Sequence, residues 1–87
     1  MKPALQIYTT DFDADFFKLA ESVRKRIEVA IDRLGANLDA HPHHAMRGVD
    51  AYRLRIGPYR VIYDFDQSHG RLLLLAIGHR REVYRQL

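Results

Sequence analysis

The sequence predicts a small α+β domain made of an N-terminal strand, a helical hairpin, a three-stranded antiparallel meander and a short C-terminal tail. Apolar residues recur at helical spacing in the first half of the chain and stop at Gly35. Strand-like runs bounded by turn residues follow in the second half, over 51–56, 59–65 and 71–78. At 87 residues the chain is predicted to be a single domain over 1–87.

The first strand and two helices are predicted within residues 4–35. Residues 4–8 alternate well enough for a strand, and Thr9, Thr10 or Asp11 can cap the helix that follows. A break is expected near Glu21–Ser22, and the two helices should then form a hairpin over one face of the sheet. The apolar positions that repeat at helical spacing are Phe12, Phe16 and Leu19 before the break, and Val23, Ile27, Ala30, Ile31 and Leu34 after it.

Residues 36–48 have no sustained apolar period and contain a proline and a glycine, so they are predicted to form a loop. His41, His43 and His44 lie in this loop. Adjacent histidines of an extended segment point apart, and no carboxylate completes a usual zinc set. The chain also has no cysteine for a thiolate site or a disulfide. The sequence therefore predicts no metal and no small-molecule cofactor.

Residues 51–65 are predicted to form a β-hairpin that carries arginines on one face. Arg53 and Arg55 alternate with apolar residues and so share one side of the first strand. A two-residue loop at Gly57-Pro58, which pairs Arg55 with Arg60, keeps Arg60 on that side, and so does a four-residue loop. Only an odd loop or a bulge would separate the three arginines. Because like charges on neighbouring strands repel, this face is expected to bind an anion, and phosphate suits guanidinium best.

The last predicted strand, 71–78, is a continuous apolar run without alternation. Such a run is typical of a central strand that is covered on both faces. The remaining residues, 79–87, are too few to form an independent helix. They are predicted to be a short tail that follows the sheet.

Basic charge is concentrated in the second half of the chain. Residues 1–46 hold six Lys and Arg against seven Asp and Glu, a balance of −1, whereas residues 47–87 hold eight against four, a balance of +4. All eight are arginine, whose planar fork suits phosphate, and this favours nucleic acid as the target. No apolar run approaches the roughly 20 residues that span a bilayer, and the start lacks a signal-peptide core. The protein is therefore expected to be cytoplasmic, without a membrane partner.

Two motifs occur in the second half of the chain, Tyr52-Arg-Leu-Arg-Ile-Gly-Pro-Tyr-Arg-Val-Ile-Tyr63 and Ile77-Gly-His-Arg-Arg-Glu-Val-Tyr84. Together they resemble the RelE/ParE superfamily of bacterial and archaeal toxins, and the resemblance covers nearly the whole chain. It implies a RelE-like fold and the toxin of a type II toxin–antitoxin system, held inactive by a cognate acidic antitoxin. RelE-like members are mRNA interferases, metal-independent endoribonucleases that cleave mRNA in the ribosomal A site and so block translation. The RNA's own 2′-OH attacks the adjacent phosphate and leaves a 2′,3′-cyclic phosphate.

The resemblance also implies three catalytic residues. Arg60 matches the arginine of the second hairpin strand, and Arg80 and Tyr84 match a C-terminal pair. The two arginines are suited to binding the scissile phosphate and its developing charge. Tyr84 is suited to stacking on or orienting a base while its hydroxyl assists proton placement.

Further basic residues are expected to bind RNA phosphates, namely Arg53, Arg55 and Arg81. The first two stand where the family often has lysine. Arginine cannot act as a general base, whereas a lysine with a depressed pKa can. The general base is therefore left open, with His79, Glu82 and Tyr84 as candidates. The alternative is that no true base operates and that electrostatic stabilisation supplies most of the rate.

Two other functions fit the same resemblance. A ParE-like member would poison DNA gyrase by binding and would cleave no RNA, and it would not need the clustered arginines. A degenerate toxin would only bind its antitoxin and repress its operon within that complex, which the unassigned base would fit. The first interpretation is the ribosome-dependent mRNA endonuclease, whose partners would be the ribosome and mRNA as well as the antitoxin.

Overall fold

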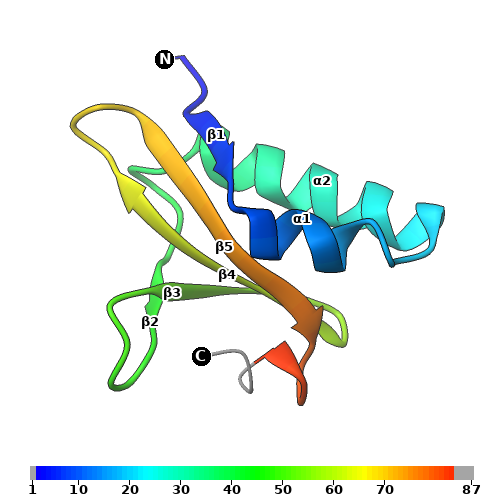
Figure 1. Cartoon of the computed structure of the whole chain (residues 1–87). Coiled ribbons are helices and arrows are strands. Elements are labelled where there is room, and N and C mark those ends of the chain that lie inside the picture. The colour runs from blue at the N-terminus through cyan, green and yellow to red at the C-terminus, as the bar shows by residue number, and fades with distance from the viewer. Residues whose placement is uncertain (1, 84–87) are drawn as a thin grey trace.

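Five strands form one mixed sheet, and two helices cover one of its faces (Figure 1). The computed structural model describes residues 2–83. The strand order is β1-β5-β4-β3-β2. The predicted α+β class is confirmed. The elements in chain order are β1 (Leu5–Tyr8), α1 (Thr10–Phe16), α2 (Glu21–Ala36), β2 (His44–Ala45), β3 (Tyr52–Ile56), β4 (Tyr59–Asp66) and β5 (Arg71–His79).

The sheet combines the predicted meander with one parallel pair. Strands β3, β4 and β5 follow one another antiparallel, as the turn residues between them indicate. Strand β1 lies parallel to β5, with partners from Leu5 and Arg71 to Tyr8 and Leu74. Pairing with β5 therefore holds β1 at the edge of the sheet. Neither helix of the described part is long and apolar enough to cross a membrane.

The prediction of a continuous loop over 36–48 is wrong at His44–Ala45. These two residues form β2, which pairs antiparallel with β3 through His44 opposite Arg53 and Ala45 opposite Tyr52. A two-residue strand is too short to show a period of two, so no local pattern could predict it. Its pairing with β3 decides the conformation of this segment.

Thr9 is the residue that caps α1. Its hydroxyl oxygen accepts a hydrogen bond from the Phe12 backbone N–H at 3.1 Å, as an N-cap does. The same hydroxyl group lies 3.1 Å and 3.0 Å from the carbonyl oxygens of Leu74 and Leu75 in β5. The start of α1 is therefore fixed directly to the sheet.

The helices bury most of their predicted apolar positions against one face of the sheet, called here the helix face. The break between them lies at residues 17–20, before the predicted Glu21–Ser22, so Leu19 lies in neither helix. Phe12, Ile27 and Leu34 are fully buried. Opposite them the sheet contributes side chains of β3, β4 and β5 that belong to the same cluster: Leu54, Ile56, Val61, Tyr63, Leu72, Leu74 and Ile77. The other side of the sheet, called here the open face, is covered by neither α1 nor α2 (Figure 1).

A bulge explains why β5 reads as a continuous apolar run. Ile62 pairs with Ala76 and the next residue, Tyr63, pairs with Leu74, so Leu75 is an extra residue in β5. The alternation changes phase there, and Leu74 and Ile77 both reach the helix face. The prediction that β5 is covered on both faces holds at Ala76, which is buried on the open face, whereas Leu75 is only half-buried.

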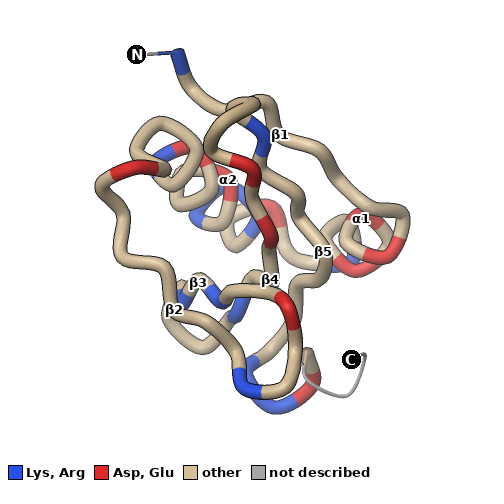
Figure 2. The backbone as a smooth tube through the Cα atoms, turned by 90° about the vertical axis from the view of Figure 1, so that its left-hand side faces the viewer, with Lys and Arg blue, Asp and Glu red and all other residues tan. Residues whose placement is uncertain are grey.

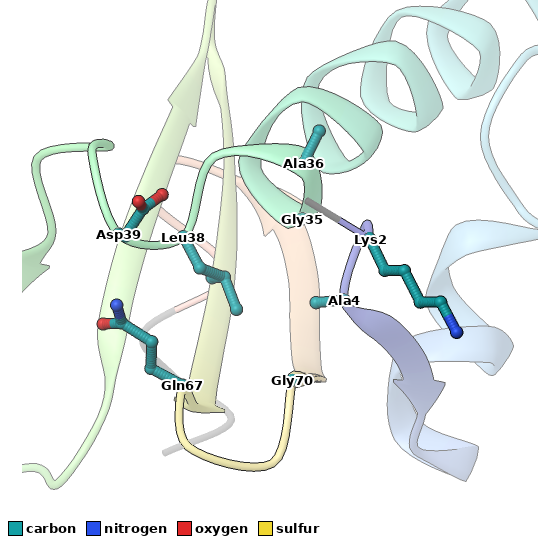
Figure 3. A pocket seen from close by; sticks show the side chains of 8 residues that line it. All are labelled: Lys2, Ala4, Gly35, Ala36, Leu38, Asp39, Gln67 and Gly70. Atoms are coloured by element: carbon teal, nitrogen blue, oxygen red, sulfur yellow. The ribbon is translucent and has the colours of Figure 1, made fainter.

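The N-terminal segment crosses the end of α2 at a glycine. The Ala4 N–H donates to the Gly35 carbonyl at 2.9 Å. A Cβ on Gly35 would lie 3.6 Å from the Leu72 side chain, which shows how closely α2 approaches β5. A hollow of about 80 Å³ remains beside this crossing (Figure 3). It is well below the several hundred Å³ of ordinary ligand pockets, so it is a gap in packing.

His43 ties the segment before β2 to the helix face. Its Nε2 lies 2.7 Å from the Leu38 carbonyl oxygen, and its Nδ1 lies 2.7 Å from the Tyr63 hydroxyl. Because the carbonyl can only accept, Nε2 donates, and in the neutral ring Nδ1 accepts from the hydroxyl. The imidazole also stacks on Phe65 with ring centroids 4.0 Å apart. His43 therefore holds the chain where β2 begins.

Tyr63 makes the stability of the fold sensitive to alkaline pH. Burial, with Tyr52 nearby, raises the pKa of Tyr63 from 10.0 to about 12. Above pH 10 the unfolded chain loses the phenol proton while the folded chain keeps it. The raised pKa of Tyr63 therefore adds to the free energy of unfolding in full below pH 10, and this stabilisation is lost as the pH rises to about 12. It amounts to at most about 3 kcal/mol.

The expected result is a smaller alkaline decline in a Tyr63→Phe variant than in the wild type. Between about pH 9 and about pH 11, the free energy of unfolding should fall by about 1 kcal/mol more in the wild type. Urea titrations at both pH values measure this difference, and any constant loss from the missing hydroxyl cancels. Equal declines in the two proteins would contradict the assignment.

Candidate functional site

The hairpin of β3 and β4 has the register with a two-residue loop. Arg55 lies opposite Arg60, and Arg53 lies opposite Ile62. Gly57 in the loop adopts a φ of 56°, which glycine permits without strain. Directly opposite residues share a face, so Arg53, Arg55 and Arg60 all lie on the open face. They are called here the arginine cluster, and their predicted common face is confirmed.

The arginine cluster takes part in no ion pair within residues 2–83. The ion pairs among these residues are Lys18 with Asp15, Lys25 with Glu21, and His69 with Asp66. Arg53 and Arg55 are exposed, whereas Arg60 is 9% exposed. Like charges on paired positions destabilise a sheet, so a bound anion would stabilise this one.

Arg60 holds the hairpin loop as well as lining the open face. Its Nη1 donates to the carbonyl oxygens of Gly57 at 2.7 Å and Tyr59 at 2.8 Å. No buried side-chain nitrogen of the described residues lacks a hydrogen-bond partner, so the remaining nitrogens of Arg60 reach solvent. One edge of the guanidinium therefore supports the turn, and the rest is free to bind an anion.

His44 is a residue of this site that the sequence analysis did not include. It lies opposite Arg53 on the neighbouring strand and therefore on the open face. A hollow of about 200 Å³ is lined by His44, Arg53 and Arg55. The available signal was that His43 and His44 point to opposite sides of an extended segment. The sequence contained no indication that this segment pairs with β3.

The turn after β5 brings two more arginines to the end of the hairpin. Arg80 and Arg81 are exposed, and the Arg80 backbone N–H donates to the Pro58 carbonyl at 2.8 Å. Val83 is fully buried beside Ile62 and Ala76, so the chain folds back over the open face. In Figure 2 the blue segments of β3 and of this turn lie on the same lower part of the molecule.

The two candidate bases lie apart from the arginine cluster. His79 pairs with Tyr59, whose ring packs with the helix-face core, and the two ring centroids are 6.2 Å apart. His79 and Glu82 line a hollow of about 330 Å³ together with Asp15 near the end of α1. The structure therefore does not bring them to the arginine cluster. Tyr84 lies outside the described residues.

The β4–β5 turn contains an Asp, a Ser and a His whose geometry is not that of a catalytic triad. The Asp66 carboxylate contacts the Ser68 hydroxyl at 2.7 Å and the His69 Nδ1 at 2.6 Å. The Ser68 hydroxyl lies 3.2 Å from the same Nδ1, whereas a triad uses both ring nitrogens. The hydrogen bond from Ser68, and then that from His69, lower the pKa of Asp66. These contacts stabilise a turn.

Comparison with protein families gives one match over most of the chain. The model of the ParE toxin of the type II toxin–antitoxin system, parDE, matches residues 7–84. No curated protein matches the chain by sequence.

Several solved structures resemble the chain over nearly their whole length. A chain of the RelBE2 toxin–antitoxin complex from Mycobacterium tuberculosis is 25% identical, with a TM-score of 0.76 over 94% of this chain and 97% of that one. The isolated RelE toxin from E. coli is 18% identical, with a TM-score of 0.74 over 95% and 93%. A chain of the RelB–RelE complex from Methanococcus jannaschii is 21% identical, with a TM-score of 0.69 over 93% of this chain and 98% of that one. At 18% and 21% identity, the last two show similarity of fold alone.

Proposed function

The chain belongs to the ParE toxin family of type II toxin–antitoxin systems, and we propose that it acts as a ribosome-dependent mRNA endonuclease of the RelE-like kind. The observation that carries this proposal is the arginine cluster. Three guanidinium groups share an open sheet face, and no carboxylate of the described residues pairs with them. A gyrase poison that acts only by binding would not need such a phosphate site.

The cluster supports cleavage by electrostatic stabilisation. In the proposed reaction the 2′-oxygen of the RNA attacks the adjacent phosphorus, and the phosphate gains negative charge in the transition state. Arg53 and Arg55 are exposed beside it, and Arg60 offers the free edge of its guanidinium. Cations that are already in position stabilise the charge of the transition state more than cations that must first reorganise. Arg80 and Arg81, at the end of the same hairpin, would hold neighbouring phosphates.

The same surface is proposed to receive the antitoxin. As a type II toxin the protein has an antitoxin partner, and its solved relatives include toxin–antitoxin complexes. An acidic antitoxin segment laid over the arginine cluster would supply the missing opposite charge and would block RNA. Inhibitor and substrate would then compete for one face.

The test adds the purified chain to programmed ribosomes and, separately, to naked transcript. New 5′ ends are mapped by primer extension. We expect cleavage within A-site codons on the ribosome and none in naked transcript, because the ribosome orients the scissile phosphate for attack. Intact mRNA in both samples, with a chain that still arrests growth when expressed, would contradict the proposal.

A gyrase poison is the second candidate, because the matching family model is that of the parDE toxin. In that case the purified chain should inhibit supercoiling by gyrase and leave mRNA intact. A degenerate toxin would do neither and would not arrest growth. The ribosome and gyrase assays on one preparation therefore separate all three functions.

A further inference from the structure

His44 is placed on the open face by its neighbour. His43 is held at the helix face by hydrogen bonds to the Leu38 carbonyl and the Tyr63 hydroxyl. Successive side chains of a strand point to opposite faces, so His44 points to the open face. The pairing of His44 with Arg53 places it there independently. Two separate contacts therefore agree on its position.

Of the described residues that line this hollow, only His44 has a side chain whose neutral form can accept a proton. The hollow of about 200 Å³ is lined by His44, Arg53 and Arg55, and arginine stays protonated in proteins. No hydrogen bond joins the His44 ring to another described residue, since the side-chain hydrogen bonds of histidine within residues 2–83 involve His41, His43 and His69. Its ring nitrogens are available to a ligand.

We propose that His44 is the general base of the cleavage reaction. This inference rests on the proposed function. The neutral imidazole takes the proton of the 2′-OH as the 2′-oxygen forms its bond to phosphorus, and the bond between phosphorus and the 5′-oxygen breaks. The departing 5′-oxygen takes a proton from water, and the His44 imidazolium gives its proton to the hydroxide that remains, which restores the neutral ring. Arg53 and Arg55 stabilise the charge that the phosphate gains between these events.

The location of the other candidate bases favours His44. His79 and Glu82 line a different hollow with Asp15, and His79 lies beside Tyr59 on the helix face. A base must come within hydrogen-bond reach of the proton that it removes. A phosphate bound by Arg53 and Arg55 therefore lies on the same face of the sheet as His44 in β2.

The test compares wild type, His44→Ala, His79→Ala and His69→Ala in single-turnover cleavage on programmed ribosomes. His44→Ala should cut about 10² to 10⁴ times more slowly, because positioned proton transfer contributes on this scale. Added imidazole should restore part of the rate of His44→Ala and should not accelerate the wild type. His69 lies in the exposed β4–β5 turn and is the matched control, expected to cleave at the wild-type rate.

Binding and folding are measured on the same proteins. Ribosomes carrying an A-site codon with a 2′-deoxy sugar cannot be cut, so they report binding alone, and His44→Ala should bind them as the wild type does. Its melting temperature should also be unchanged, because His44 is exposed at a sheet edge.

Each other outcome overturns the inference in a distinct way. If the wild type does not cleave, the proposed function fails and the inference fails with it. If the wild type cleaves and His44→Ala matches it, the proposed function stands and only the role of His44 is refuted. A rate loss that imidazole does not restore, or that accompanies weaker binding of the 2′-deoxy complex, assigns His44 to substrate binding. A loss confined to His79→Ala assigns the base to His79.

Discussion

Replacing Arg53 and Arg55 together with alanine is expected to slow single-turnover mRNA cleavage on programmed ribosomes by at least about 10²- to 10³-fold. Removal of one stabiliser of transition-state charge costs a rate factor of this size. Both side chains are exposed, and no ion pair within the described residues depends on them. The free energy of unfolding should therefore change by no more than about 0.5 kcal/mol.

The matched control removes two positive charges from the helix layer, through Lys25→Ala and Arg33→Ala. Both residues are exposed on α2, so the net charge falls by the same amount without touching the open face. Normal cleavage by this control and loss in Arg53→Ala with Arg55→Ala would tie the effect to the arginine cluster. Equal rates in both double variants would refute the site. Arg60→Ala is a weaker test, because it also releases the loop carbonyls of Gly57 and Tyr59.

Phe12→Ala is expected to lower the free energy of unfolding by about 3–5 kcal/mol. Phe12 is fully buried between α1 and the sheet, and its ring lies 5.5 Å from that of Phe16. Truncation loses the transfer free energy of the ring and leaves a cavity that the close α1–β5 packing resists closing. For a domain of this size the melting temperature should fall by more than about 10 °C.

Phe17→Ala is the control for this change. Phe17 is 66% exposed one residue beyond α1, so its loss should alter the free energy of unfolding by no more than about 0.5 kcal/mol. Urea titration with a common slope measures both variants. Similar losses in the two variants would show that α1 is not packed as described.

Local patterns of the sequence were sufficient for most of the elements and for the arginine cluster. The helical spacing of Phe12, Ile27 and Leu34 places each of them in the core. The alternation around Arg53 and Arg55, with a loop of even length, places the three arginines on one face. In both cases the deciding interactions connect residues that lie close together along the chain.

Features that depend on distant pairing could not be read from local patterns. The parallel contact of β1 with β5 and the pairing of His44 with Arg53 join segments whose own residues do not encode a partner. The bulge at Leu75 hides the alternation of β5, so the run looked like a strand covered on both faces. His44 was missed for this reason, since its role depends on the strand that it pairs with.

The pairing of β1 with β5 also sets when a newly made toxin can act. At about 5–20 residues per second, several seconds separate synthesis of the first strand from synthesis of the last. Strand β5 supports both β4 and β1, so the sheet and its arginine cluster assemble only after nearly the whole chain has left the ribosome that made it. Contacts this distant along the chain also slow folding. On the proposed function, the chain could therefore cleave mRNA only after its own synthesis is nearly complete.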